Sequence, residues 1–262
     1  MGKIDLAFDH ITDTKEITEL SVVLYADSFF YGLWGSDNKL LKTGYHPLYS
    51  MESVSAIWDY YYDFSSSKVM SAQLPFAHLP SELYEESDFE LYFNGLYNLN
   101  RVHSKSRQSD VLAYKEVTTL HFLESRTLDL VNVLSLTNVA HISTAMANHI
   151  ADTNSELICH IANHKLHITV QDENGFRFYN QFHCSYESDY LYYLILVAEK
   201  FGFDRHKQAL KIGGEIAESS PLFHEIKGHF HLTELLSQII NFRQSQISSN
   251  RYCDLYLCKT CV

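Results

Sequence analysis

LICHIANHKLHITVQDENGFRFYNQF, residues 157–182, is the stretch of sequence that decides the fold. Every second residue from Leu166 to Val170 is apolar, which is the period of a strand with one buried face. Two turn signals, Asn163-His164 and Asn174-Gly175, interrupt the pattern, and Asn-Gly favours a tight hairpin. The stretch therefore predicts three short strands joined by two hairpin turns.

A helix and a fourth strand are predicted directly after these three strands. Residues 187–201 contain a continuous apolar run from Leu191 to Ala198, which is typical of a helix that is buried on most sides. The apolar residues of the segment 209–212 then predict a strand. The order is strand, strand, strand, helix, strand (β-β-β-α-β).

The same order of elements is predicted in the first part of the chain. Strands are expected at 20–25, 29–34, 40–45 and 69–74, with a helix that begins at Ser50 before the last of them. The turn at Asp27-Ser28 precedes the turn at Asn163-His164 by about 136 residues, and Ser50 precedes Glu187 by about 137. This equal spacing predicts a duplicated unit whose fourth strand runs parallel to its first. The alternative is a chance match, because no residue identity supports the repeat.

The duplication predicts two domains, residues 1–152 and 153–262, the first of which carries inserted helices at about 81–130. The sequence of this region predicts helices at 81–98, 117–130 and 142–150, and strands at 111–114 and 131–136.

Composition and charge exclude several classes of function. The net charge is −12, and Lys and Arg form no cluster, which argues against a nucleic-acid or anionic-membrane binder. No apolar run approaches the roughly 20 residues of a membrane helix, and residues 1–19 lack the apolar core of a signal peptide. The odd number of cysteines, 5, is typical of reduced thiols. These features predict a cytoplasmic protein.

Several segments carry a family resemblance. The order of elements, the duplication and the segment KIGGEI (211–216) resemble the sugar-kinase/chaperone/actin superfamily. LYADSFFYGLW (24–34), LPFAHLPSELYEE (74–86) and DYLYYLILVAEKFGFDRHKQALKIGGEI (189–216) resemble a Bacteroidota family of unknown function with an assigned actin-like ATPase fold. The resemblance implies an α/β fold of two actin-like (ribonuclease H-like) lobes. Actin-like adaptors of type IV pilus assembly and type II secretion are more distantly similar.

The resemblance also implies a nucleotide cleft between the lobes, bounded in this chain by Asp27, Ser28, Asn163, Gly213, Gly214 and Glu215. Members of the superfamily carry an Asp-x-Gly turn in each lobe, which positions Mg²⁺, water and phosphate. Here the first lobe has Asp27-Ser28-Phe29, and the second has HIAN (160–163). The alternatives are that Gly213-Gly214 is a tight turn without a ligand and that Phe29 and Phe30 fill the cleft.

We therefore expect a catalytically degenerate binding or scaffold protein with an unidentified protein partner, no catalytic residue and no required cofactor. The alternative is a nucleotide-responsive switch or weak ATPase that uses ATP or ADP with Mg²⁺ in the cleft.

Two groups of residues in the sequence could bind a metal ion. His160, His164 and His167 share one hairpin, and the C-terminal cysteines Cys253, Cys258 and Cys261 follow the spacing C-x₄-C-x₂-C. Zinc would require these side chains to converge with further ligands, and only one cysteine pair is tightly spaced. We expect no metal, and free thiols at the C-terminus.

Overall fold

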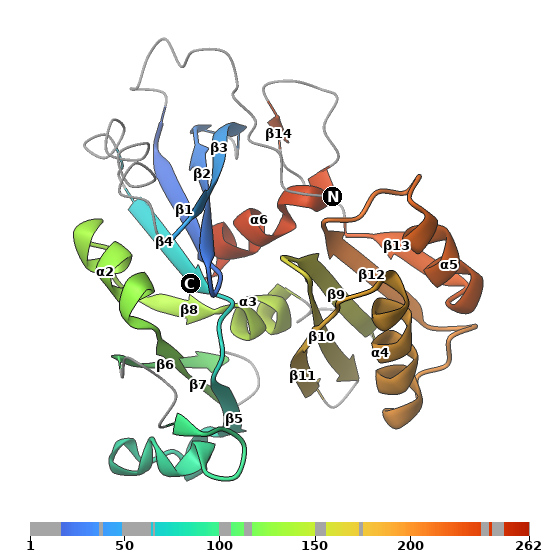
Figure 1. Cartoon of the computed structure of the whole chain (residues 1–262), viewed down its shortest axis with the longest axis horizontal. Helices are drawn as coiled ribbons and strands as arrows, with labels where there is room; N and C mark the ends of the chain where they lie inside the picture. Colours follow the sequence, from blue (N-terminus) through green and yellow to red (C-terminus); the bar gives the residue numbers. More distant parts are fainter. Residues whose placement is uncertain are drawn as a thin grey trace. The chain divides into compact units, whose positions relative to one another are not determined.

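The computed structural model describes residues 17–36, 39–48, 64, 66–99, 106–112, 117–149, 156–172, 175–236, 241–242 and 249–261. The chain divides into two compact units, the N-unit and the C-unit (Figure 1). The N-unit comprises the described residues between 4 and 148 together with 241–242 and 255–261. The C-unit comprises those between 149 and 239 together with 249–254.

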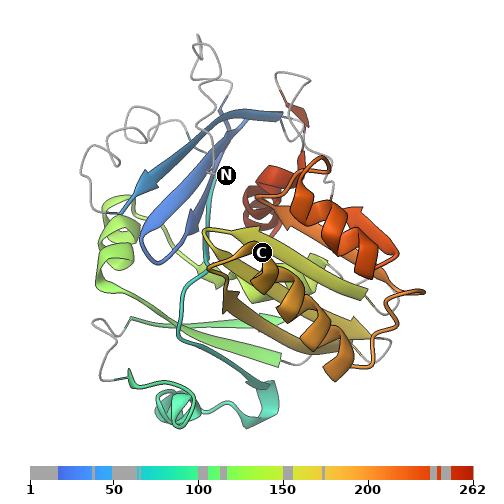
Figure 2. The same cartoon turned by 45° about the vertical axis from the view of Figure 1, so that its right-hand side comes forward.

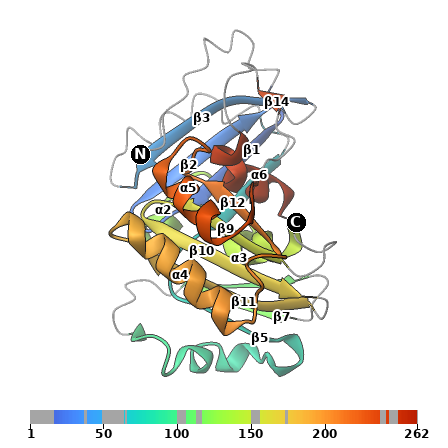
Figure 3. The same cartoon turned by 90° about the vertical axis from the view of Figure 1, so that its right-hand side faces the viewer.

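The C-unit is built on a five-stranded sheet with the order β11-β10-β9-β12-β13. Its strands are β9 (Glu156–Ala162), β10 (Lys165–Asp172), β11 (Gly175–His183), β12 (Ala209–Gly214) and β13 (Leu232–Leu235). The first three strands pair antiparallel, and β12 pairs parallel with β9, so the predicted topology of this repeat is confirmed. Helices α4 (Glu187–Lys200) and α5 (Pro221–His229) cover one face of this sheet (Figure 3).

Local sequence explains the boundaries in the C-unit. Asn163 and His164 have φ values of 50° and 55°, the left-handed conformation that a two-residue hairpin turn requires. The Asp189 carboxylate accepts hydrogen bonds from the backbone N–H groups of Ser185 and Tyr186, at 2.8 and 2.9 Å, and so satisfies donors at the start of α4. Ser220 caps α5, which begins at a proline.

The N-unit repeats the same pairing in a six-stranded sheet with the order β14-β3-β2-β1-β4-β8. Its strands are β1 (Glu19–Leu24), β2 (Ser28–Trp34), β3 (Lys39–Pro47), β4 (Ser66–Ser71), β8 (Val139–His141) and β14 (Asn241–Phe242). Strands β1, β2 and β3 are antiparallel neighbours, and β4 runs parallel to β1, as in the C-unit. The helix predicted from Ser50 lies outside the described residues. The shared topology supports the duplication.

Two helices pack on opposite faces of the N-unit sheet. Leu20, Val22 and Leu24 share a core with Leu130 and Leu134 at α2 (Ser125–Val133). On the other face, α6 (Cys253–Thr260), which follows the 3₁₀ turn η8 (Ser249–Tyr252), contacts the sheet. The Leu255 side chain lies over Gly32, where an added Cβ would be 2.9 Å from it, and Cys258 Sγ donates to the carbonyl of Val22 at 3.4 Å.

The insert in the N-unit corrects two predictions. Instead of a helix over 81–98, three short 3₁₀ turns are present: η4 (Ser81–Leu83), η5 (Glu86–Asp88) and η6 (Leu91–Phe93). Instead of a helix over 117–130, the chain forms strand β7 (Val117–Leu123) and then α2. Strand β7 lies between β5 (Phe76–Pro80) and β6 (Ser106–Leu112) in a three-stranded sheet (Figure 2).

The prediction of one helix over 117–130 is wrong because β7 runs almost directly into α2. An apolar pattern that fits a single helix therefore spans two elements. The β-branched residues Val117, Thr118 and Thr119 favour the strand. The predicted strand at 131–136 is also wrong, because 131–133 complete α2 and the strand is β8. Helix α3 (Ile142–His149) agrees with the prediction.

Candidate functional site

The glycine pair at the end of β12 forms the best-defined part of the predicted nucleotide site. Gly214 has a φ of +93°, and a Cβ added there would lie 2.0 Å from the carbonyl oxygen of Ile161. A Cβ added at Gly213 would lie 2.3 Å from Cys253 Sγ. Both positions therefore require glycine for the chain's own packing, whether or not a ligand binds.

Residues near the C-terminus cover this glycine turn within the C-unit. The buried side chain of Asn250 donates through Nδ2 to the carbonyl oxygens of Gly214, at 3.3 Å, and Ile216, at 2.7 Å. The Cys253 thiol lies over Gly213. The glycine backbone that the family resemblance places at the nucleotide cleft is thus in contact with side chains of this chain.

The structure brings together the predicted site residues of the C-unit. The backbone N–H of Glu215 donates to the carbonyl of Ile161 at 2.7 Å, and a Glu215 carboxylate oxygen accepts from the backbone N–H of Asn163 at 3.3 Å. The Glu215 side chain therefore ties the β9–β10 hairpin to the turn after β12. This contact positions the hairpin.

A buried cluster that sequence reasoning missed lies beside the glycine turn. His160 Nδ1 is 3.1 Å from Cys253 Sγ, and His160 Nε2 is 3.8 Å from an Asp254 carboxylate oxygen. All three side chains are fully buried. A thiol, an imidazole and a carboxylate in this order resemble a nucleophilic triad, but a substrate cannot reach fully buried atoms. No local spacing could have indicated the contact, because His160 and Cys253 are 93 residues apart.

The three hairpin histidines do not converge at one point, although the rings of His160 and His167 are cross-strand neighbours with centroids 5.9 Å apart. His164 is exposed on the turn, whereas His167 is buried and its Nδ1 lies 2.8 Å from the Tyr179 hydroxyl. Within the part of the chain that the structure describes, no three His, Cys, Asp or Glu side chains are placed to hold a metal ion.

The N-unit half of the predicted site is a short hairpin turn between β1 and β2. Ser28 begins β2 rather than lying in the turn, and Asp27 is exposed. Ser28 Oγ donates to Asp27 Oδ1 at 2.9 Å and accepts from the Tyr45 hydroxyl at 2.7 Å. Phe29 and Phe30 are both buried, and Phe29 belongs to the core of the N-unit sheet. That Asp27 and Ser28 share a cleft with the glycine turn stays a prediction.

All five cysteines are described, none forms a disulfide, and all are buried. Burial raises the pKa of Cys261 to about 12, with a further contribution from the charge of Asp110. Burial likewise raises the pKa of Cys159. The Cys261 and Cys159 thiols therefore have little thiolate character, and the other C-terminal thiols, Cys253 and Cys258, are buried as well.

The sequence matches the profile of one protein family. The profile of a family described as a protein of unknown function (DUF3822) matches residues 58–232. The chain belongs to the DUF3822 family. A search of curated proteins found no match for this DUF3822 chain.

Solved structures show the fold of this DUF3822 chain. A protein from Bacteroides thetaiotaomicron VPI-5482, with an actin-like ATPase fold and unknown function, aligns with a TM-score of 0.69 and 16% identity over 96% of this chain and 99% of that chain. A chain of the PilM-PilN type IV pilus biogenesis complex aligns with a TM-score of 0.55 and 9% identity over 93% of this chain and 98% of that chain. The DUF3822 chain has the actin-like fold. None of its described helices is long and apolar enough to cross a membrane.

Proposed function

We propose that this DUF3822 chain is a binding or scaffold protein that retains the actin-like fold without its phosphate chemistry. The observation that carries the proposal is the covered glycine turn. Cys253 Sγ lies so close over Gly213 that a single added carbon would clash with it at 2.3 Å, and Asn250 binds the Gly214 carbonyl. A base or ribose would have to displace these buried side chains before it could lie on the backbone.

The loss of catalytic groups supports the same conclusion. Hydrolysis of a nucleoside triphosphate needs carboxylates that hold Mg²⁺ and the attacking water. In the C-unit the corresponding hairpin carries His160, which is buried against Cys253, and Asn163, whose backbone N–H binds Glu215. In the N-unit, Phe29 stands two residues after Asp27, at the position where a glycine would let the backbone approach a phosphate. Each lost interaction of this kind removes several kcal/mol of transition-state stabilisation.

A structural analogue is consistent with a role in protein binding. The PilM-PilN complex of type IV pilus biogenesis contains a chain that shares the fold at 9% identity. Fold likeness alone does not transfer a partner, so the analogy supports only the general role of protein binding.

The proposal is tested by thermal unfolding of the full chain with millimolar ATP or ADP and Mg²⁺. We expect no change in Tm and no Mg²⁺-dependent phosphate release approaching about one per second. A saturable rise in Tm that is lost in Asp27→Asn would instead establish the nucleotide switch. This variant preserves the acceptor of the Ser28 hydroxyl and removes only the charge. A pull-down with the full chain should recover the same proteins with and without ATP.

A further inference from the structure

A polar pocket of about 440 Å³ lies within the N-unit, between two open sheet edges. Strand β6 is the edge of the three-stranded sheet, and β8 is the edge of the six-stranded sheet. The pocket is lined by Gln108, Ser109, Asp110, Val111, Asn138, Val139, Ala140, Thr144 and Asn148. Its volume is in the range of small-molecule sites. It contains no residue of the predicted nucleotide site.

The Asp110 carboxylate is fixed in this pocket through one of its two oxygens. Oδ2 accepts from the backbone N–H of His141 at 2.5 Å and from Thr144 Oγ1 at 3.4 Å, and it lies 3.6 Å from Nε2 of the buried His121. Among the described residues, no hydrogen bond reaches Oδ1, and no Lys or Arg pairs with Asp110. The side chain is 14% exposed, so the carboxylate is held in place and still open to a ligand.

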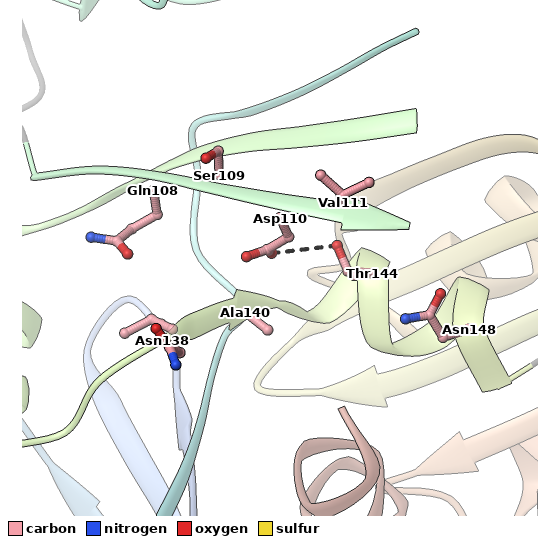
Figure 4. A pocket seen from close by; sticks show the side chains of 9 residues that line it. Gln108, Ser109, Asp110, Val111, Asn138, Ala140, Thr144 and Asn148 are labelled. Carbon is pink, nitrogen blue, oxygen red and sulfur yellow. Dashed lines mark hydrogen bonds between the residues drawn. The ribbon is translucent and has the colours of Figure 1, made fainter. Parts of the chain in front are cut away.

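The remaining polar lining groups can also accept hydrogen bonds from a ligand. Figure 4 shows Asp110 between Gln108 of β6 and Asn148 of α3, with Asn138 just before the start of β8. Carboxamide oxygens accept hydrogen bonds, and they can turn toward a donor. The described lining contains no Lys or Arg and no aromatic side chain. A phosphate or carboxylate would find no cation here, and a flat base would find no stacking partner.

We propose that this pocket binds the primary ammonium group of an organic ligand, with Asp110 Oδ1 as the charged acceptor and Gln108 and Asn148 as neutral acceptors. An ammonium carries three donors and no acceptor, which matches one carboxylate with carboxamides on either side. The charge-assisted bond to Asp110 supplies most of the discrimination against a neutral ligand of the same shape. The pocket is independent of the function proposed above, because it shares no residue with the glycine turn.

The test is an NMR titration of the ¹⁵N-labelled full chain with two ammonium probes and their neutral matches. Cadaverine, compared with 1,5-pentanediol, represents a free amine. Nα-acetyl-lysine methylamide, compared with the norleucine derivative, represents a lysine side chain of a partner protein. We expect saturable shifts in β6 and α3 with an ammonium probe and at least tenfold weaker binding of its neutral match. Binding of cadaverine alone assigns the site to a free amine, and binding of the capped lysine assigns it to a protein side chain. Failure of both probes overturns the proposal.

Variants show whether Asp110 carries the binding. Asp110→Asn should weaken binding of the ammonium probe at least tenfold, while the carboxamide oxygen of the new Asn side chain can still accept from the His141 N–H. Asp129→Asn is the matched control, because Asp129 lies on α2 and does not line the pocket. Asn148→Leu should weaken binding several-fold and keeps the test decisive if Asp110→Asn does not fold. Unchanged affinity in both pocket variants would refute the assignment.

Discussion

Gly213→Ala is the substitution that most directly tests whether the chain itself fills its predicted nucleotide surface. The new Cβ would lie 2.3 Å from Cys253 Sγ, more than 1 Å inside ordinary van der Waals contact. Cys253 is fully buried, so the thiol cannot move into solvent. Overpacking of this kind costs about 1–3 kcal/mol. We therefore expect Gly213→Ala to lower the free energy of unfolding by about 2 kcal/mol.

Repeating Gly213→Ala in a Cys253→Ala background tests whether the clash with the Cys253 sulfur causes this loss of stability. Without the sulfur, the nearest neighbours of the new Cβ are Cβ atoms of residues 253 and 236 at 3.4 Å, an ordinary contact. The substitution should then cost less than about 0.5 kcal/mol, which gives a coupling energy of about 1–3 kcal/mol between the two positions.

Urea unfolding followed by far-UV circular dichroism measures these differences. Gly228→Ala is the matched control in the exposed face of α5, where nothing lies within 4 Å of the added carbon. It should stabilise the chain by about 0.5–1 kcal/mol. Equal costs of Gly213→Ala in both backgrounds would refute the reasoning.

Three other outcomes are expected. Burial, with the charge of His121, lowers the pKa of His78 from 6.5 to about 4, so the ring is neutral in the folded chain near pH 7. The unfolded chain binds this proton more readily, so the folded state loses stability as the pH falls from about 6.5 to about 4. Between pH 7 and pH 4.5, the free energy of unfolding measured in urea should fall by about 1–2 kcal/mol more in the unsubstituted chain than in His78→Gln, a range that allows for the partly exposed ring. Equal falls in the two chains would contradict this. Leu255→Ala, which opens a cavity over Gly32, should cost about 2–5 kcal/mol in the same assay, and a cost below about 1 kcal/mol would show that α6 is not packed there. The five buried thiols should resist Ellman's reagent at pH 8 and all react in urea, whereas rapid labelling of the folded chain would show exposed thiolate.

The sequence by itself determined the parts of the fold that depend on short-range patterns. The alternation from Leu166 to Val170, the turn at Asn163-His164 and the apolar run inside α4 each specify a period or a backbone conformation within a few residues. Their repeated order also predicted the duplication, whose strand pairing both units share.

Only the tertiary structure decided which distant residues meet. The apolar residues from 117 to 130 fit a single helix, and pairing with β5 and β6 selects the strand for the first half of that segment. The glycine pair was visible in the sequence, but its contact with Cys253 depends on the place where the C-terminal segment packs. The Asp110 pocket likewise requires two sheet edges that no local pattern connects. A sequence pattern encodes the conformation of its own neighbourhood, whereas close packing between remote segments decides what a site can hold.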